Sequence, residues 1–186
     1  MDVKTKKGKK RWCAIVGPSY FKNNQLGESY VYEPTDLINK TIEVNLSNLI
    51  GDARKQNINI QFKIKEVKGS EAYAETVSYL MVAAHVKRMV RAGREKLDDS
   101  FTIETKDKEK LKIKPVIITK NKAKNSILTK IRMGIRDHFS KMGKTKNFQE
   151  ILKEVIDNNA QREIKSRINK TYPLSIIEIR ELSLCR

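Results

Sequence analysis

Two histidines and two cysteines are the side chains of this sequence that most readily bind a transition metal. Cys13 and Cys185 stand near opposite ends of the chain, and His85 and His138 lie between them without the short spacing that a zinc site needs. Two cysteines also make no disulfide framework. We therefore expect no metal site and no cofactor, and reduced cysteines that pack as small hydrophobic side chains.

A second set of residues suggests phosphate chemistry, because Gly143-Lys144-Thr145 resembles the end of a phosphate-binding loop. Such a loop needs another glycine five residues before Gly143, where His138 stands, and it follows a strand rather than a helix. The sequence also has no G-x-S-x-G and no H-E-x-x-H motif. We therefore expect no enzyme and no small-molecule substrate.

Positive charge is the strongest chemical signal of the sequence. There are 39 Lys and Arg against 22 Asp and Glu, a net charge of +17. Residues 1–11 hold six basic side chains and one acidic, residues 106–146 hold fourteen and three, and the remainder is nearly balanced. Such clustering favours a nucleic-acid partner, because a cation displaces counterions only where it meets a phosphate. Solvated surface runs are the alternative reading.

The candidate RNA-binding cations form three groups: an N-terminal arm, a helix expected over 79–92 with the residues after it, and the basic segment 106–146. In the second group Lys87 and Arg91 are four residues apart, and Arg94 follows three later, so a helix would align them. If residues 114–125 are extended, three alternate lysines point the same way. The full set is Lys4, Lys6, Lys7, Lys9, Lys10, Arg11, Lys87, Arg88, Arg91, Arg94, Lys120, Lys122, Lys124, Lys130, Arg132 and Arg136.

Hydrophobic periodicity indicates which elements position these cations. Alternation predicts strands at 41–46, 57–67, 72–77, 101–103, 111–113 and 174–184, with Pro115 at an edge or bulge. Residues 79–92 predict a helix because they have few helix breakers and are rich in Ala, Met, Leu and Val. Apolar residues three and four apart predict further helices at 124–142 and 147–168. Asn147 and Glu150 have the spacing of a capping box.

Together these elements predict an α+β fold, an antiparallel β-barrel-like sheet with about three helices packed on it. At 39% hydrophobic residues, a chain of 186 residues can bury a core. We expect a basic flexible arm at 1–10, followed by a single α+β domain at 11–186 that contains the basic segment 106–146.

Aromatic residues are few, at 6% of the chain. Tyr20, Phe21, Tyr30 and Tyr32 cluster early and could stack on bases, although such clusters more often pack under a loop. There is no RNA-recognition-motif signature of interleaved aromatic residues and glycine. The sequence therefore favours contact with the backbone of a folded RNA over reading of a single strand.

No membrane or secretion signal is apparent. The N-terminal MDVKTKKGKKRW has no apolar core, and no window approaches the roughly 18 apolar residues of a membrane span. We expect a soluble cytoplasmic protein with no membrane partner.

Four blocks of the sequence are similar to one known family. They are KRWCAIVGPSYF at 10–21, LINKTIEVNLSNLIGD at 37–52, the stretch from Lys55-Gln56 to EVKGSEAYAE at 66–75, and KTYPLSIIEIRELSL at 170–184. In this order they resemble the archaeal and eukaryotic small-subunit ribosomal protein family called S-one-e, or S-three-A-e. Departures occur at Ser78-Tyr79, where relatives often have Gly-His, and at Ala84, where they have an acid.

The resemblance implies a structural constituent of the small ribosomal subunit, on its platform near the messenger exit, that supports translation in the cytoplasm. It implies contact with small-subunit ribosomal RNA and neighbouring small-subunit ribosomal proteins, and leaves messenger RNA near the exit open as a partner. Lys10, Arg11, Lys87 and Arg91 match the family's basic positions; the other cations follow from charge alone. The alternative is a free RNA- or DNA-binding protein, such as a chaperone or regulator, outside the ribosome.

Overall fold

The computed structural model describes residues 9–185, so Lys4, Lys6, Lys7 and most of the arm expected at 1–10 lie outside the described residues. The chain divides into two compact units, Met1–Val77 (unit 1) and Ser78–Arg186 (unit 2). Because the boundary falls inside strand β5, Glu71–Met81, the single domain expected over 11–186 stays a prediction.

Unit 1 is built mainly from strands. It contains β1 (Arg11–Val16), β2 (Gln25–Val31), β3 (Thr41–Asn45), β4 (Ile58–Lys68) and the first part of β5, with short helical turns between them: Ser19–Phe21, Pro34–Leu37, α1 (Leu46–Ile50) and Ala53–Lys55. The strands pair in the order β2-β1-β5-β4-β3, and only the β1–β5 pair is parallel. The hairpin expected from 57–67 and 72–77 is confirmed as β4 and β5.

The core of unit 1 lies on the side of these strands where alternate side chains are apolar. Ile60, Phe62 and Ile64 of β4 are almost fully buried, and so are Cys13 of β1 and Ala72 of β5. The rings of Phe21 and Phe62 meet edge to face at 5.8 Å. Phe21 is therefore a core residue, which excludes it as a base-stacking side chain.

Unit 2 combines the end of β5 with β6 (Lys96–Asp98), β7 (Phe101–Glu104), β8 (Lys110–Thr119) and β9 (Leu174–Cys185). The end of β5 pairs with β9, β9 pairs with β8, and β6 and β7 both pair with the other edge of β8. The register of β8 against β9 shifts between Lys114 and Pro115, an irregularity at the proline where an edge or a bulge was expected.

The expectation of a closed barrel is wrong. In the part of the chain that the structure describes, the pairings of unit 1 end at β2 and β3, and those of unit 2 run from the end of β5 to β6 and β7 at the other edge. Closure was expected because open sheets expose unpaired edges. Short edge strands also limit the number of unpaired backbone groups at a sheet edge, and β6 and β7 have only three and four residues.

Unit 2 carries four of the five α-helices that the described residues form, against the three or so expected. They are α2 (Ala83–Met89), α3 (Asn125–Thr145), α4 (Phe148–Ile156) and α5 (Asn159–Asn169). The single helix expected at 147–168 is two, because Asn158 takes a left-handed conformation with φ of 60°. The capping box is confirmed at Glu150, whose Oε2 accepts from the Asn147 backbone N–H at 3.0 Å.

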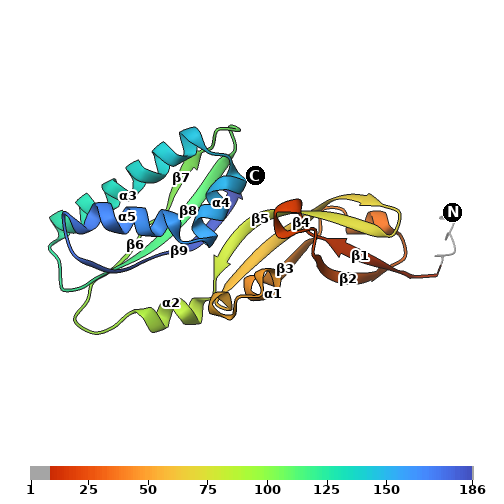
Figure 1. Ribbon diagram of the computed structural model, residues 1–186, viewed down its shortest axis with the longest axis horizontal. Coiled ribbons are helices and arrows are strands. Elements are labelled where there is room, and N and C mark those ends of the chain that lie inside the picture. The colour runs from red at the N-terminus through yellow and green to blue at the C-terminus, as the bar shows by residue number, and fades with distance from the viewer. Residues whose placement is uncertain (1–8, 186) are drawn as a thin grey trace, which may run out of the picture. The chain divides into compact units, whose positions relative to one another are not determined.

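The helices of unit 2 cover its strands from two sides. Figure 1 shows α3 and α5 side by side over β7, β8 and β9. Val86 and Met89 of α2 instead pack on Val116 and Ile118 of β8, whose neighbour Ile117 is also buried. Since successive strand side chains point to opposite faces, α2 lies on the face away from the long helices. None of the described helices is long and apolar enough to span a membrane.

Candidate nucleic-acid interface

The most concentrated group of exposed cations is the loop 120–124, which we call the lysine loop. Strand β8 ends at Thr119 and α3 begins at Asn125, so Lys120, Lys122 and Lys124 do not alternate along a strand as the sequence suggested. All three are exposed. The three lysines therefore do not share one direction along a strand. They lie instead in a loop next to the N-terminal end of α3.

Hydrogen bonds with Thr119, at the end of β8, and with Tyr172 and Pro173, just before β9, fix the backbone of the lysine loop. The Thr119 hydroxyl donates to the Asn121 carbonyl at 2.6 Å, and the Tyr172 hydroxyl donates to the Lys122 carbonyl at 2.9 Å. The Lys120 N–H donates to the Pro173 carbonyl at 3.2 Å. The main chain is thus fixed while the three ammonium groups remain in solvent, which reduces the ordering cost of binding a ligand.

The electrostatics of the lysine loop favour an external anion. Lys124 is the N-cap of α3, whose first turn contains no acidic residue, and a helix N-terminus already carries partial positive charge. Among residues 9–185, no carboxylate forms an ion pair with any of the three lysines. Positive charge therefore accumulates here without an internal partner.

Further along α3 the expected cations differ in whether they form an ion pair. Lys130 and Arg132 are exposed on the side away from Ile131 and Ile135, which are buried. Arg136 instead donates to both carboxylate oxygens of Asp99, at 2.8 and 2.6 Å, and its guanidinium lies 5.8 Å from the Phe101 ring centroid. These hydrogen bonds lower the pKa of Asp99 and hold it ionised.

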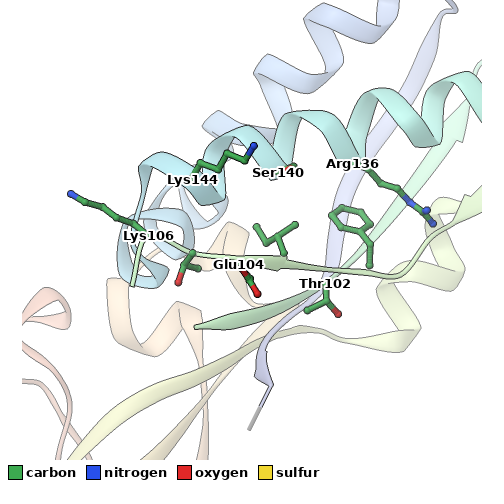
Figure 2. Close-up of a pocket in the computed structure, with 9 residues that line it drawn as sticks. Thr102, Glu104, Lys106, Arg136, Ser140 and Lys144 are labelled. Atoms are coloured by element: carbon green, nitrogen blue, oxygen red, sulfur yellow. The ribbon is translucent and has the colours of Figure 1, made fainter. Parts of the chain in front are cut away.

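A groove of about 650 Å³ runs between β7 and α3, and the sequence did not reveal it. Three α3 residues spaced by four, Arg136, Ser140 and Lys144, form one wall, and the chain from Phe101 to Lys106 forms the other. Figure 2 shows Thr102 and Glu104 pointing to the side of β7 away from α3. On the α3 side the groove is lined by two cations, Lys144 and Arg136, of which Arg136 is paired with Asp99.

Gly143 explains how α3 comes so close to β7. A β-carbon at this position would lie 2.6 Å from the Glu104 carbonyl oxygen and 3.0 Å from the Ile103 side chain. The glycine that suggested a phosphate-binding loop therefore serves helix packing. Lys144 and Lys106 were not among the sixteen candidate cations, although both lie in the basic segment 106–146.

The cations around α2 do not form the single helical row that their spacing suggested. Strand β5 continues to Met81 and α2 ends at Met89, so the helix is shorter than the expected 79–92. Lys87 and Arg88 are exposed on α2, and Arg91 is exposed after it. Arg94 is partly buried, and its Nη1 donates to the Ser175 hydroxyl at 2.7 Å.

Of the N-terminal group, the described residues include Lys9, Lys10 and Arg11, which are all exposed at the start of β1. They belong to unit 1, whereas the lysine loop, the α3 cations and the α2 group belong to unit 2. The structure therefore brings together the basic segment around α3 and leaves the other two groups on separate surfaces or units. RNA contact by any of these residues stays a prediction.

The remaining titratable groups of the described residues were compared with the requirements of a metal site. No cluster of three or more His, Cys, Asp or Glu side chains suited to a metal ion occurs among residues 9–185. Cys13 is buried and Cys185 is exposed. Burial lowers the pKa of His138, whose Nε2 lies 3.8 Å from a Glu163 carboxylate oxygen.

Comparison with known proteins gives one family. The family model described as "Ribosomal S3Ae family" matches residues 2–186. The chain is 32% identical over 170 residues to "Small ribosomal subunit protein eS1" of Methanothermobacter thermautotrophicus, covering 91% of this chain and 87% of that protein. It is 31% identical over 176 residues to the protein of the same name from Nanoarchaeum equitans, covering 95% and 89% respectively.

Proposed function

Because this chain belongs to the Ribosomal S3Ae family, we propose that it is a structural constituent of the small ribosomal subunit and supports translation by binding ribosomal RNA. The family consists of structural ribosomal proteins, and the chain is not an enzyme. Its relatives from Methanothermobacter and Nanoarchaeum are named as small ribosomal subunit proteins, and they align over most of their length.

The lysine loop is the observation that carries the RNA-binding part of the proposal. Three exposed lysines and the N-terminus of α3 concentrate positive charge on a backbone held by Thr119 and Tyr172. A phosphate backbone supplies the missing anion, and its contacts release condensed counterions. Lys130 and Arg132 extend this surface along α3, and the β7–α3 groove adds Lys106 and Lys144.

We further propose the location and partners that the sequence blocks imply: the platform of the subunit near the messenger exit, within cytoplasmic ribosomes. There the chain contacts small-subunit ribosomal RNA and neighbouring ribosomal proteins, with messenger RNA as a partner near the exit. The proposal of several partners is supported by exposed cations at three separate places in the chain. Cations occur on α3, on α2 at the opposite face of the same strands, and at the start of β1 in unit 1.

Sedimentation tests the proposal. A tagged copy of the full chain, expressed in cells of an archaeon, is expected in the small-subunit peak of a sucrose gradient at moderate salt. A chain that remains at the top of the gradient, bound to other RNA or DNA, would instead support a free nucleic-acid-binding protein. Release from the peak with rising salt is expected, because phosphate contacts are screened and replaced by ions.

A further inference from the structure

Unit 1 carries an exposed aromatic surface at the paired strands β1 and β2. Trp12 of β1 and Tyr30 of β2 are register partners, and their ring centroids are 4.9 Å apart at an angle of 40°. Trp12 is 64% exposed, Tyr30 51%, and Tyr32 40%. We call Trp12, Tyr30 and Tyr32 the aromatic platform.

The platform lies on the outer side of the β1–β2 pair. Cys13 and Ile15 of β1 are buried in the core of unit 1, so their neighbour Trp12 points to the opposite face. Burying Trp12 and Tyr30 together would stabilise a domain, yet both rings remain in solvent in this chain. An exposed aromatic cluster of this kind marks a surface for a partner.

The charges around the platform indicate the partner's chemistry. The Lys10 ammonium lies 5.7 Å from the Tyr30 ring centroid and 5.1 Å from that of Tyr32. Lys9 and Arg11 are exposed beside it, and residues 1–11 contain six basic side chains and one acidic. Stacking rings next to a row of cations is the combination that single-stranded nucleic acids require, with bases on the rings and phosphates on the cations.

We propose that the aromatic platform stacks on unpaired bases of a single-stranded RNA segment, with Trp12 as the principal stacking side chain and Lys10 as the adjacent phosphate contact. The inference rests on the proposed function, since it names the form of RNA that unit 1 takes. The RNA segment lies on the side of the platform that carries Lys9, Lys10 and Arg11, and away from Glu28. That carboxylate is exposed two residues before Tyr30 on β2 and accepts from the Gln25 amide at 2.9 Å.

The platform offers a direct optical test, because Trp12 is the only tryptophan of the chain. Stacking of a base on Trp12 quenches its fluorescence. Titration of the full chain with a short oligouridylate is expected to quench the emission in step with binding. An abasic oligomer of equal length and charge is expected to bind more weakly and to leave the emission nearly unchanged. Equal quenching by both oligomers would overturn the proposal.

Two substitutions separate stacking from general apolar contact. Trp12→Leu keeps an apolar side chain without the ring, and it is expected to weaken oligouridylate binding by about 10- to 100-fold without changing its salt dependence. Trp12→Phe is expected to bind within about 3-fold of the original chain, because a ring remains. Tyr30→Leu repeats the test on a second ring. Unchanged thermal unfolding of each variant confirms that the fold is intact.

The outcomes distinguish this inference from the proposed function. If the chain sediments with the small subunit but Trp12→Leu binds oligouridylate as tightly as the original, only the stacking proposal fails. If Trp12→Leu keeps its oligouridylate affinity and is incorporated less into subunits, the platform binds a neighbouring protein, which also overturns it. If the chain is absent from the small-subunit peak while oligouridylate still quenches Trp12, the proposed function fails and the stacking surface stands.

Discussion

The two units of the molecule place different chemistry on their surfaces. Unit 1 has thirteen basic and nine acidic side chains, and unit 2 has twenty-six and thirteen, so unit 2 carries +13 of the net +17. Within residues 9–185, every aromatic side chain that is exposed by more than a third lies in unit 1. Unit 2 is thus suited to RNA phosphates, and unit 1 to RNA bases.

This division matters because the two kinds of contact respond differently to solution conditions. Binding through cations weakens steeply with salt, whereas stacking of bases on rings has little salt dependence of its own. The comparison between the units can therefore be tested by removing charge from one unit at a time.

Replacing Lys120, Lys122 and Lys124 together by Ala should have the largest effect on binding. Loss of three phosphate contacts lowers the slope of log affinity against log salt by about 2–3, which is about 100-fold in affinity near 0.1 M salt. The matched control, Lys22, Lys40 and Lys55 to Ala, removes three charges from unit 1 instead. Filter binding to small-subunit ribosomal RNA at several salt concentrations measures both. Equal effects of the two triple variants would remove the distinction between the units.

Unit 2 also contains a partly buried acid, Glu178 of β9. Burial raises the pKa of Glu178 from its usual 4.5 to about 7, and Lys165 opposes this only in part. Between these two values the folded chain holds a proton that the unfolded chain has lost, so stability falls as pH rises.

Glu178→Gln should remove this pH dependence. The variant should be more stable than the original chain above pH 7 by roughly 3 kcal/mol and about equal to it near pH 4. Chemical denaturation of both proteins at a series of pH values measures the difference. Glu75→Gln, a change at an exposed acid of unit 1, is the control and should show no comparable gain. A constant difference between the Glu178→Gln variant and the original at all pH values would contradict the expectation.

The local sequence pattern predicted much of the secondary structure of unit 1 and less of that of unit 2. The alternation of Ile58, Ile60, Phe62 and Ile64 predicted β4, because a two-residue period is a property of the segment itself. The beginning of α2 did not follow from its sequence, since Leu80 and Met81 are good helix formers, yet the sheet includes this segment by pairing Tyr79 with Leu182. Pairing of β5 with β9, which lies far along the chain, thus determines where β5 ends and where α2 can begin.

The candidate site shows the same limit. The basic segment 106–146 was visible in composition, and the structure keeps most of it around α3. The pairing of Arg136 with Asp99 joins positions 37 residues apart and was not visible, and neither was the β7–α3 groove. The outward direction of Trp12 followed only once Cys13 and Ile15 were seen to be buried.

The close approach of α3 to β7 beside the groove depends on Gly143, and replacing this glycine should have an intermediate effect on stability. Gly143→Ala places a methyl group against the Glu104 carbonyl oxygen, at a backbone position that cannot move aside easily. Overpacking of this kind costs about 1–3 kcal/mol. Thermal unfolding measures it, with Gly134→Ala as the control, because the nearest atom to a β-carbon there is 3.9 Å away. If the two variants were equally stable, α3 would not be limited by its contact with β7.

The smallest expected effect separates cations that hold the fold from cations that face RNA. Asp99→Asn removes the charge that Arg136 contacts, and it should destabilise unit 2 by about 1 kcal/mol, because Arg136 is half exposed and screened by solvent. The pKa of Asp99 is lowered by Arg136, so this stability is present above the usual carboxylate pKa and is lost as pH falls through the folded value.

The same substitution should act oppositely on RNA binding. Without Asp99 as an ion-pair partner, the Arg136 guanidinium becomes available to a phosphate, and the salt slope should steepen by up to about 0.7–0.9. Asp36→Asn removes an equal charge from an exposed position of unit 1 and should leave both stability and slope unchanged. A lower stability with an unaltered slope would show that Arg136 serves the fold alone, and the RNA-facing surface of unit 2 would then begin at Arg132 and extend to the lysine loop.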